Sequence, residues 1–296
     1  MTNCKLKITL CTAALAVWLS GQAGAQTFHS HAVRVPGSSS VLVTGINSSG
    51  EMVANYTDSA GSDHCELISG STITQIVDPN QTGTGPGNGT NCWGINNSGQ
   101  IVGSYSFTPW GNGFLYSGGT YIDVIVPGAT AGTIAYGLNN AGGIVGSFAD
   151  NVGQHGFLYT VSNSTYSTLN VPGATYTLAI GVNDGGEITF EWVNGSFVYS
   201  GATFKNGKYK ILNVPGMQQS KARGINVHGW IDFNAQDSSG VWHGFLYKGG
   251  TFTQFDVANA ANTYSFAIND SGKLAGGYNP TAKPTTEIGF DGSIAK

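Results

Sequence analysis

Charged residues are scarce in this chain, which has 12 Lys and Arg and 16 Asp and Glu among 296 residues, for a formal net charge of −4. Binding to nucleic-acid backbones depends on clustered cations, so this composition argues against a nucleic-acid partner. Long hydrophobic runs are also lacking outside the N-terminal segment. No stretch in the rest of the chain approaches the roughly 20 apolar residues that cross a bilayer. The chain has no Gly-x-Ser-x-Gly elbow and no calcium-binding run of alternating Asp.

The first 25 residues differ from the rest of the chain. Two lysines precede an apolar run at 8–19, and the small residues Ala-Gly-Ala follow at 23–25. This order is typical of a secretory signal peptide cleaved after Ala25, and a buried first helix is the alternative. We therefore predict a signal peptide at 1–25 and a mature chain, 26–296, that is secreted or periplasmic and has no membrane anchor.

Glycine is abundant, with 45 residues, and six glycines close an Asn-x-x-Gly motif that recurs along the chain. Each motif follows a small residue and an apolar residue, and together they define copies one to six of a repeat. The first residues of the motifs are Asn47, Asn96, Asn139, Asn183, Asn226 and Asn269. Asn at the first position and Gly at the fourth favour a tight turn in a hairpin. We interpret these asparagines as turn formers, and a ligand role is the alternative.

Each copy contains four predicted strands, of which the hairpin supplies two. The third strand is expected at 113–116, 156–159, 196–199 and 244–247, and the fourth leads into the Val-Pro-Gly turns at 126–128, 171–173 and 214–216. Pro followed by Gly is the central pair of a type II turn. Four strands with a period of forty-odd residues indicate the blade of a β-propeller.

The two ends of the chain complete this pattern. Copy six stops after its third strand, 288–290, whereas residues 27–37 match a fourth strand with its Val-Pro-Gly turn. Pairing 29–35 with 288–290 would close the ring and remove exposed edges. We therefore predict an all-β fold, a single six-bladed β-propeller of four-stranded repeats at 26–296, closed by the N-terminal strand. An open β-solenoid is the alternative.

The pattern Gly-(Ile or Leu)-Asn-x-x-Gly-x-Ile-Val-Gly, followed by His-Gly-Phe-Leu-Tyr, resembles the HAF repeats of bacterial extracellular proteins. The resemblance covers nearly all of 27–296 and is strongest in copies two, three and five. Copy four departs from it at 187–190 and copy one at 64–68. The resemblance implies a secreted, propeller-like repeat protein, and it brings no catalytic residues.

Signal cleavage would leave two of the four cysteines, Cys65 and Cys92. Both occupy repeat positions that otherwise hold mostly small residues, and they lie on adjacent copies. An even count in an oxidising compartment permits one bridge, so we predict a Cys65–Cys92 disulfide. Two buried free thiols are the alternative.

Histidines and acids are the candidate residues for metal binding and acid–base chemistry. A histidine precedes the third strand in copies one, three and five: His64, His155 and His243. Third strands lie roughly 10 Å outside the innermost strand, so these side chains would be too far apart to share an ion. We predict strand-entry hydrogen bonds for them, and no metal. No two carboxylates have the fixed separation that glycoside hydrolysis requires, so we predict no catalytic residues and no cofactor.

The loops between second and third strands are the predicted ligand-binding face. They carry or adjoin three tryptophans and three acids: Trp110, Trp192, Trp242, Asp58, Asp150 and Asp237. Aromatic rings there would stack on sugars or grip a peptide, with packing between blades as the alternative. We predict a monomeric, non-enzymatic binding or interaction module for an extracellular glycan or protein. The alternatives are a carbohydrate-active hydrolase or lyase, and a structural surface or matrix protein.

Overall fold

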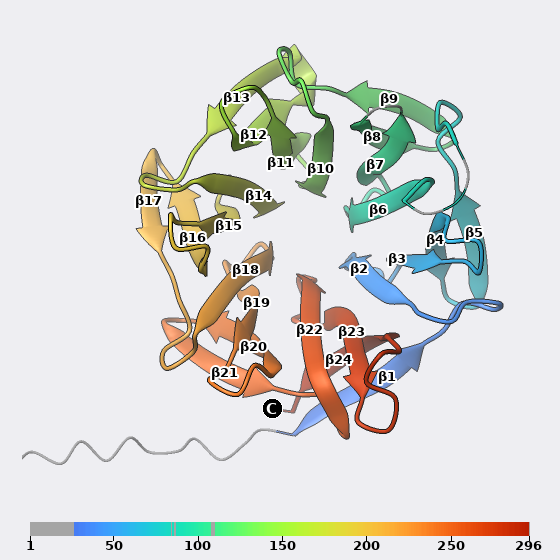
Figure 1. The fold of residues 1–296 in the computed structure, drawn as a ribbon, viewed down its shortest axis with the longest axis vertical. Coiled ribbons are helices and arrows are strands. Elements are labelled where there is room, and N and C mark those ends of the chain that lie inside the picture. Colours follow the sequence, from blue (N-terminus) through green and yellow to red (C-terminus); the bar gives the residue numbers. More distant parts are fainter. Residues whose placement is uncertain (1–26, 84, 86, 108–109, 296) are drawn as a thin grey trace, which may run out of the picture.

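The computed structural model describes residues 27–295, except for 84, 86, 108 and 109 and the side chains of Phe107 and Trp110. In this part of the chain, 24 β-strands and one short helix, η1 (Val161–Asn163), form a ring of sheets around a central axis (Figure 1). No helix among these residues has the length and hydrophobicity to cross a membrane. The predicted all-β propeller is confirmed, whereas the predicted signal peptide, 1–25, lies outside the described residues.

Four of the sheets have four antiparallel strands each, with the first strand of each copy next to the axis (Figure 1). The first two are β2 (Leu42–Ile46), β3 (Met52–Thr57), β4 (Asp63–Ser69) and β5 (Thr72–Ile76), and β6 (Thr90–Ile95), β7 (Ile101–Phe107), β8 (Trp110–Ser117) and β9 (Thr120–Val124). The others are β18 (Gln219–Ile225), β19 (Ile231–Gln236), β20 (Trp242–Lys248) and β21 (Thr251–Phe255), and β22 (Ala260–Ile268), β23 (Leu274–Pro280), β24 (Ile288–Ile294) and β1 (Phe28–Val33).

The fifth sheet has eight strands, because copies three and four are hydrogen-bonded to each other. Its halves are β10 (Thr133–Leu138), β11 (Gly143–Ala149), β12 (Gln154–Thr160) and β13 (Thr165–Leu169), and β14 (Tyr176–Val182), β15 (Ile188–Val193), β16 (Tyr199–Lys205) and β17 (Lys208–Ile211). One parallel pair, Gln154 with Tyr176, joins them. The corresponding contact between copies one and two is an isolated bridge, Asp63 with Gly89. The expected six separate sheets are therefore corrected to five.

The hairpin turns form where the repeat predicts them. In all six, the amide of the Gly that closes the motif donates to the carbonyl of its Asn at 3.0–3.4 Å. These glycines have φ between 71° and 85°, a region that residues with a side chain rarely adopt. The glycines of the Val-Pro-Gly turns, at 37, 128, 173 and 216, have φ between 79° and 89°. The turn chemistry thus confirms the strand boundaries derived from Asn, Pro and Gly.

The third strand of copy four lies elsewhere than predicted. Residues 196–199 were expected to form it, but the strand is β16 and begins at Tyr199. A turn from Asn194 to Phe197 precedes it, with Phe197 at φ 57° and its side chain exposed. The core explains the shift, because Phe190 on the second strand pairs with Ala202. In copy three the large side chain is on the third strand, where Phe157 pairs with Gly146.

The ring closes through the N-terminal strand, as predicted. β1 pairs antiparallel with β24, from Phe28 opposite Ile294 to Val33 opposite Gly289. The Phe28 ring packs against Phe255 and Phe290, at centroid distances of 4.7 and 5.6 Å. Pairing and packing together cover the edge that copy six would otherwise expose.

The predicted disulfide between Cys65 and Cys92 is present. It joins β4 to β6 with a Cα–Cα distance of 5.5 Å, and both residues are fully buried. Neighbouring side chains include Val53 and Phe114, so the bridge lies inside the apolar layer between copies one and two. Such bridges are typical of oxidising, extracytoplasmic compartments.

Candidate functional site

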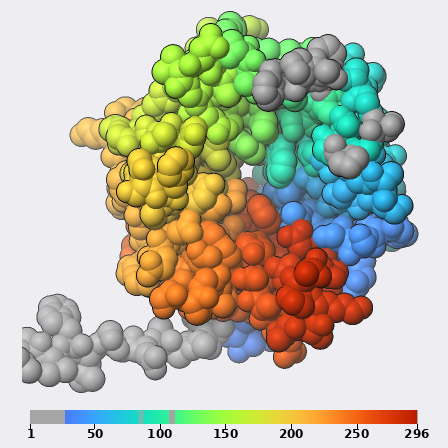
Figure 2. Space-filling model, in the orientation of Figure 1, coloured from blue at the N-terminus to red at the C-terminus, as the bar shows by residue number. Residues whose placement is uncertain are grey.

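A channel runs along the axis of the ring, lined by the six innermost strands (Figure 2). The hairpin turns surround one end, which we call the narrow end. The loops between second and third strands lie at the opposite, wide end. Within the channel an apolar ring lies next to the turns and consists of Ile46, Ile95, Leu138, Val182, Ile225 and Ile268.

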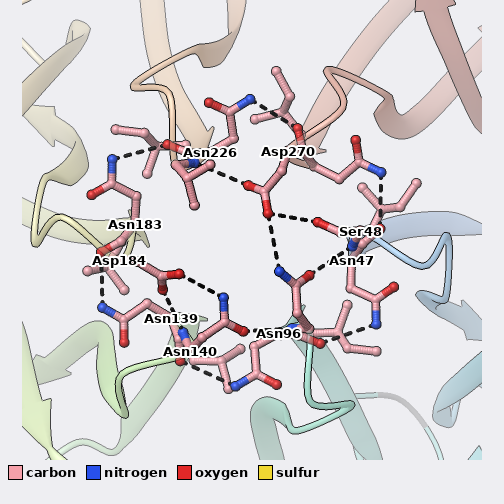
Figure 3. Close-up of a pocket in the computed structure, with 18 residues that line it drawn as sticks. Asn47, Ser48, Asn96, Asn139, Asn140, Asn183, Asp184, Asn226 and Asp270 are labelled. Atoms are coloured by element: carbon pink, nitrogen blue, oxygen red, sulfur yellow. Dashed lines mark hydrogen bonds between the residues drawn. The ribbon is translucent and has the colours of Figure 1, made fainter.

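The six repeat asparagines form a closed hydrogen-bonded belt at the narrow end (Figure 3). Each Nδ2 donates to the backbone carbonyl of the asparagine in the next copy, at 3.0–3.3 Å, and Asn269 returns to Asn47. Each Oδ1 accepts the backbone N–H four residues later, at 2.7–3.0 Å. The belt therefore confirms these residues as turn formers and adds an inter-copy bond that sequence reasoning missed.

A second ring of polar side chains covers the belt. Asp270 Oδ2 accepts from Ser48 Oγ at 2.7 Å and from Asn97 Nδ2 at 3.2 Å. Burial opposes ionisation of Asp270, but the bonds from Ser48, Val227 and Asn97 outweigh it and lower its pKa. The space lined by these groups has a volume of about 70 Å³. Because these groups bond to one another and the space is small, the channel is constricted at the narrow end.

The wide end contains a larger cavity, of about 270 Å³, between copies five and six. Three aromatic side chains line it, Trp242, Tyr264 and Phe266. Its polar lining consists of Lys221, Arg223, Asn234 and Glu287. Aromatic faces next to a few converging polar groups are the usual composition of a ligand pocket.

A buried ion cluster forms one wall of this cavity. Glu191, on β15 of copy four, is 3% exposed and lies 3.1 Å from Lys221 Nζ and 3.2 Å from an Arg223 guanidinium nitrogen. Lys221 Nζ is also 3.7 Å from the Tyr199 ring centroid and 5.2 Å from that of Trp242. Burial lowers the pKa of Lys221, and Glu191 opposes the shift. The cluster therefore places two cations and one anion at the mouth of the channel.

The repeats show that the cluster is specific to this part of the ring. Measured from the belt asparagine, the position of Lys221 holds Leu42, Asn91, Ile134, Leu178 and Tyr264 in the other copies. The position of Arg223 holds Thr44, Trp93, Tyr136, Ile180 and Phe266. By strand register, Glu191 replaces Ser104 and Ser147 of copies two and three. Three charged substitutions in adjacent copies thus meet in space.

A further acid is buried behind the cluster. Asp232, on β19, is fully buried, and its burial raises its pKa to about 7, opposed by Ser265 and Arg223. A Cβ on Gly224 would lie 2.7 Å from Asp232 Oδ1, so this side chain packs under the innermost strand. It does not line the cavity.

The predicted tryptophans separate in the structure. Trp242 lines the cavity, at the start of β20. Trp192 packs beside the core of copy four, and its Nε1 donates to the Gly201 carbonyl at 3.4 Å. Trp110 begins β8, and its side chain lies outside the described residues. The structure thus places one predicted tryptophan in a cavity and assigns another to packing.

The predicted acids lie in the expected loops but belong to local turns. Each accepts backbone N–H groups of its own loop, and each pairs with the histidine at the second position of the next strand: Asp58 with His64 at 2.9 Å, Asp150 with His155 at 3.2 Å and Asp237 with His243 at 3.4 Å. Hydrogen bonds from Ser239, Val241 and His243 lower the pKa of Asp237 to about 2. The strand-entry hydrogen bonds predicted for the histidines are confirmed.

The cavity residues were missed from sequence except for Trp242. The available signal was the break in the repeat, because Lys221 and Arg223 put charge at positions that are otherwise uncharged. Among the described residues, no group of three or more His, Cys, Asp or Glu side chains is arranged to hold a metal ion.

No protein-family model and no curated protein matches the chain. Solved propellers do. A mutant of the Aleuria aurantia lectin in complex with Fucalpha1-6GlcNAc has 11% identity, with 90% of this chain and 97% of that one covered, at a TM-score of 0.52. AofleA from Arthrobotrys oligospora has 11% identity, coverage of 88% and 84%, and a TM-score of 0.55. A protein of unknown function from Dyadobacter fermentans DSM 18053 has 9% identity, coverage of 90% and 98%, and a TM-score of 0.57. At these identities the similarity shows the fold alone.

Proposed function

We propose that this protein is an exported, non-enzymatic glycan-binding module and that the wide-end cavity is its binding site. The observation that carries the proposal is the lining of that cavity. Trp242 and Tyr264 offer aromatic faces, Lys221 and Arg223 offer donors, and Glu287 offers acceptors. Sugars have apolar C–H faces that stack on aromatic rings and hydroxyl groups that both donate and accept hydrogen bonds.

The buried ion cluster supports a binding role. Taking charges out of water is unfavourable, and replacing a buried ion group by apolar residues is often neutral or stabilising. Copies two and three do without charge at the position of Glu191, so the fold does not require the cluster. A ligand site is a reason to retain it.

The architecture supports the same class of function. Counting the two halves of the eight-stranded sheet separately gives six blades. One of the solved structures with a similar fold is a lectin in complex with a fucosylated sugar. The predicted signal peptide, the HAF-like repeats and the disulfide agree with export to an oxidising compartment.

A glycan array probed with the mature protein, followed by calorimetry on the best glycan, tests the proposal. Trp242→Ala should weaken binding at least tenfold, because stacking and shape at the cavity are lost, while the melting temperature changes little. Val152→Ala, in the exposed loop between β11 and β12, is the matched control and should bind normally.

Two outcomes would contradict the proposal. Full-strength glycan binding by a folded Trp242→Ala variant would place the site elsewhere. Shortening or elimination products of the bound glycan, seen by mass spectrometry after incubation, would show an enzyme instead.

A further inference from the structure

A second cavity shares a lining residue with the wide-end cavity. It has a volume of about 260 Å³ and lies where the N-terminal strand leads into β2, lined by Arg34, Ser39, Ser40 and neighbouring residues. Glu287 lines both cavities. It anchors the junction, because its carboxylate accepts from Ser40 Oγ at 3.3 Å and its carbonyl accepts from the Val41 amide at 3.1 Å. Glu287 is therefore the residue that the two cavities share.

The whole chain has two arginines, and each lines one of these cavities: Arg34 the second and Arg223 the first. Arg34 is exposed, and no acid pairs with it among the described residues. Arg223 uses one guanidinium nitrogen on Glu191, and its Nε is buried without a hydrogen-bond partner. Arginine is the residue best suited to planar anions such as carboxylates, which it binds with two parallel hydrogen bonds.

The charge along the two cavities is positive in an otherwise acidic chain. Arg34, Lys221 and Arg223 supply three cations, whereas Glu191 and Glu287 supply two anions. Asp232 lies behind Arg223 and does not line either cavity, and its raised pKa leaves it partly protonated near neutral pH. The net charge of the chain is −4, so this excess of cations is local.

We infer that the two cavities form one groove for a linear acidic oligosaccharide, with one acidic group at Arg34, another at Arg223 and Lys221, and a sugar face on Trp242. This inference rests on the proposed glycan-binding function and adds to it the charge of the ligand and its length. A single sugar fills only one cavity, whereas a chain of several residues spans both. Carboxylate and sulfate groups both have the required chemistry.

The probes are galacturonate, mannuronate and glucuronate oligosaccharides of one to six residues, their neutral methyl esters, and sulfated galactan oligosaccharides of equal length. Affinity should rise with chain length in the acidic series and fall on esterification or at higher salt. The better of the uronate and sulfate series identifies the acidic group. Arg34→Gln should weaken binding of the long acidic chains about fivefold and leave the shortest ones unchanged, since exposed ion pairs contribute up to about 1 kcal/mol.

Lys283→Gln removes an exposed cation from the β23–β24 loop and is the matched control, expected to bind like the parent protein. Ser39→Trp, at an exposed position of the second cavity, provides an independent test and should also weaken only the long chains. Unchanged binding of long acidic chains by both variants would overturn the groove, and equal binding of neutral esters would overturn the acidic ligand, in each case leaving glycan binding in place. Failure to bind any glycan on the array would remove the proposed function as well.

Discussion

The buried cluster of Glu191, Lys221 and Arg223 allows stability and binding to be separated by mutation. Replacing Glu191→Ser alone leaves two cations whose side chains are 17% and 18% exposed and which lose their shared partner. Breaking a buried ion group in this way destabilises a protein by about 3–5 kcal/mol. Copies two and three have serine at this position, so the strand pair accommodates a serine side chain there without a steric clash.

The triple variant Glu191→Ser, Lys221→Leu, Arg223→Ile removes all three charges and inserts residues that other copies carry at the same positions. Replacing a complete buried ion group by apolar residues is neutral or stabilising by about 1–4 kcal/mol. The triple variant should therefore be more stable than the single variant by about 3 kcal/mol or more, although it carries more substitutions. It should also have lost glycan binding.

Urea denaturation followed by circular dichroism measures the free energy of unfolding of all three proteins. The matched control is the exposed pair of Glu187 and Lys205, 3.0 Å apart with the lysine side chain 53% exposed. Glu187→Ser should change stability by no more than about 1 kcal/mol. A triple variant less stable than Glu191→Ser would refute the reasoning, because the ion group would then be needed for the fold.

Three further predictions concern the ring itself. Loss of the disulfide in a Cys65→Ser, Cys92→Ser variant should lower the free energy of unfolding by roughly 3–4 kcal/mol, because the unfolded chain gains the entropy of an open loop between residues 27 positions apart. An unchanged denaturation midpoint would count against this. Deletion of 27–37 uncovers β24 and should cause aggregation, which light scattering would detect; a monomeric truncated protein as stable as the parent would show that closure is dispensable. Burial raises the pKa of Asp232 to about 7 from 3.8. Between about pH 4 and 7 the folded state therefore holds a proton that the unfolded state has released, so the contribution of Asp232 to the free energy of unfolding falls as the pH rises. Asp232→Asn should flatten that decline and be more stable than the parent at pH 8, as melting temperatures at pH 5 and 8 would show; an equal decline in both proteins would assign it to other groups.

The repeat period and the turn chemistry made most of the fold predictable from sequence. Asn and Gly at fixed spacing specify a local backbone conformation, and local conformation can be read without knowing the tertiary contacts. The unpaired fourth strand at 27–37 and the incomplete copy six predicted the closure. Cys65 and Cys92 occupy positions that hold mostly small residues in the other copies, and these positions on adjacent copies predicted the disulfide.

The third strand of copy four could not be placed from the repeat pattern. Residues 196–199 match the Gly-Phe-Leu-Tyr pattern in part, but the strand that pairs begins at Tyr199. Its position is determined by packing, since Phe190 fills from the second strand the volume that a third-strand Phe fills in copy three. A compensating exchange of large and small residues across a strand pair has no local sequence signature.

The asparagine belt was predicted only in its local half. The turn of each Asn follows from its own motif, whereas the bond from Nδ2 to the next copy depends on how closely six hairpins approach the axis. In copies one to five a glycine precedes the residue of the apolar ring, and a Cβ added there would lie 2.4–2.9 Å from atoms of neighbouring strands or of the same copy; copy six has Ala267 at this position. Sequence spacing contains no information about this radial distance.

The candidate site was decided by tertiary structure. Sequence reasoning placed ligand binding on the loops, and Trp242 does line the cavity, but Asp58, Asp150 and Asp237 are used by their own turns. Glu191 and the pair Lys221 and Arg223 come from different copies, 30 or more residues apart. They meet because β15, the second strand of copy four, packs against β18, the innermost strand of copy five. Sequence alone determines which positions break the repeat; only the closed ring determines which of those positions share a cavity, because the curvature of the ring sets the distances between copies.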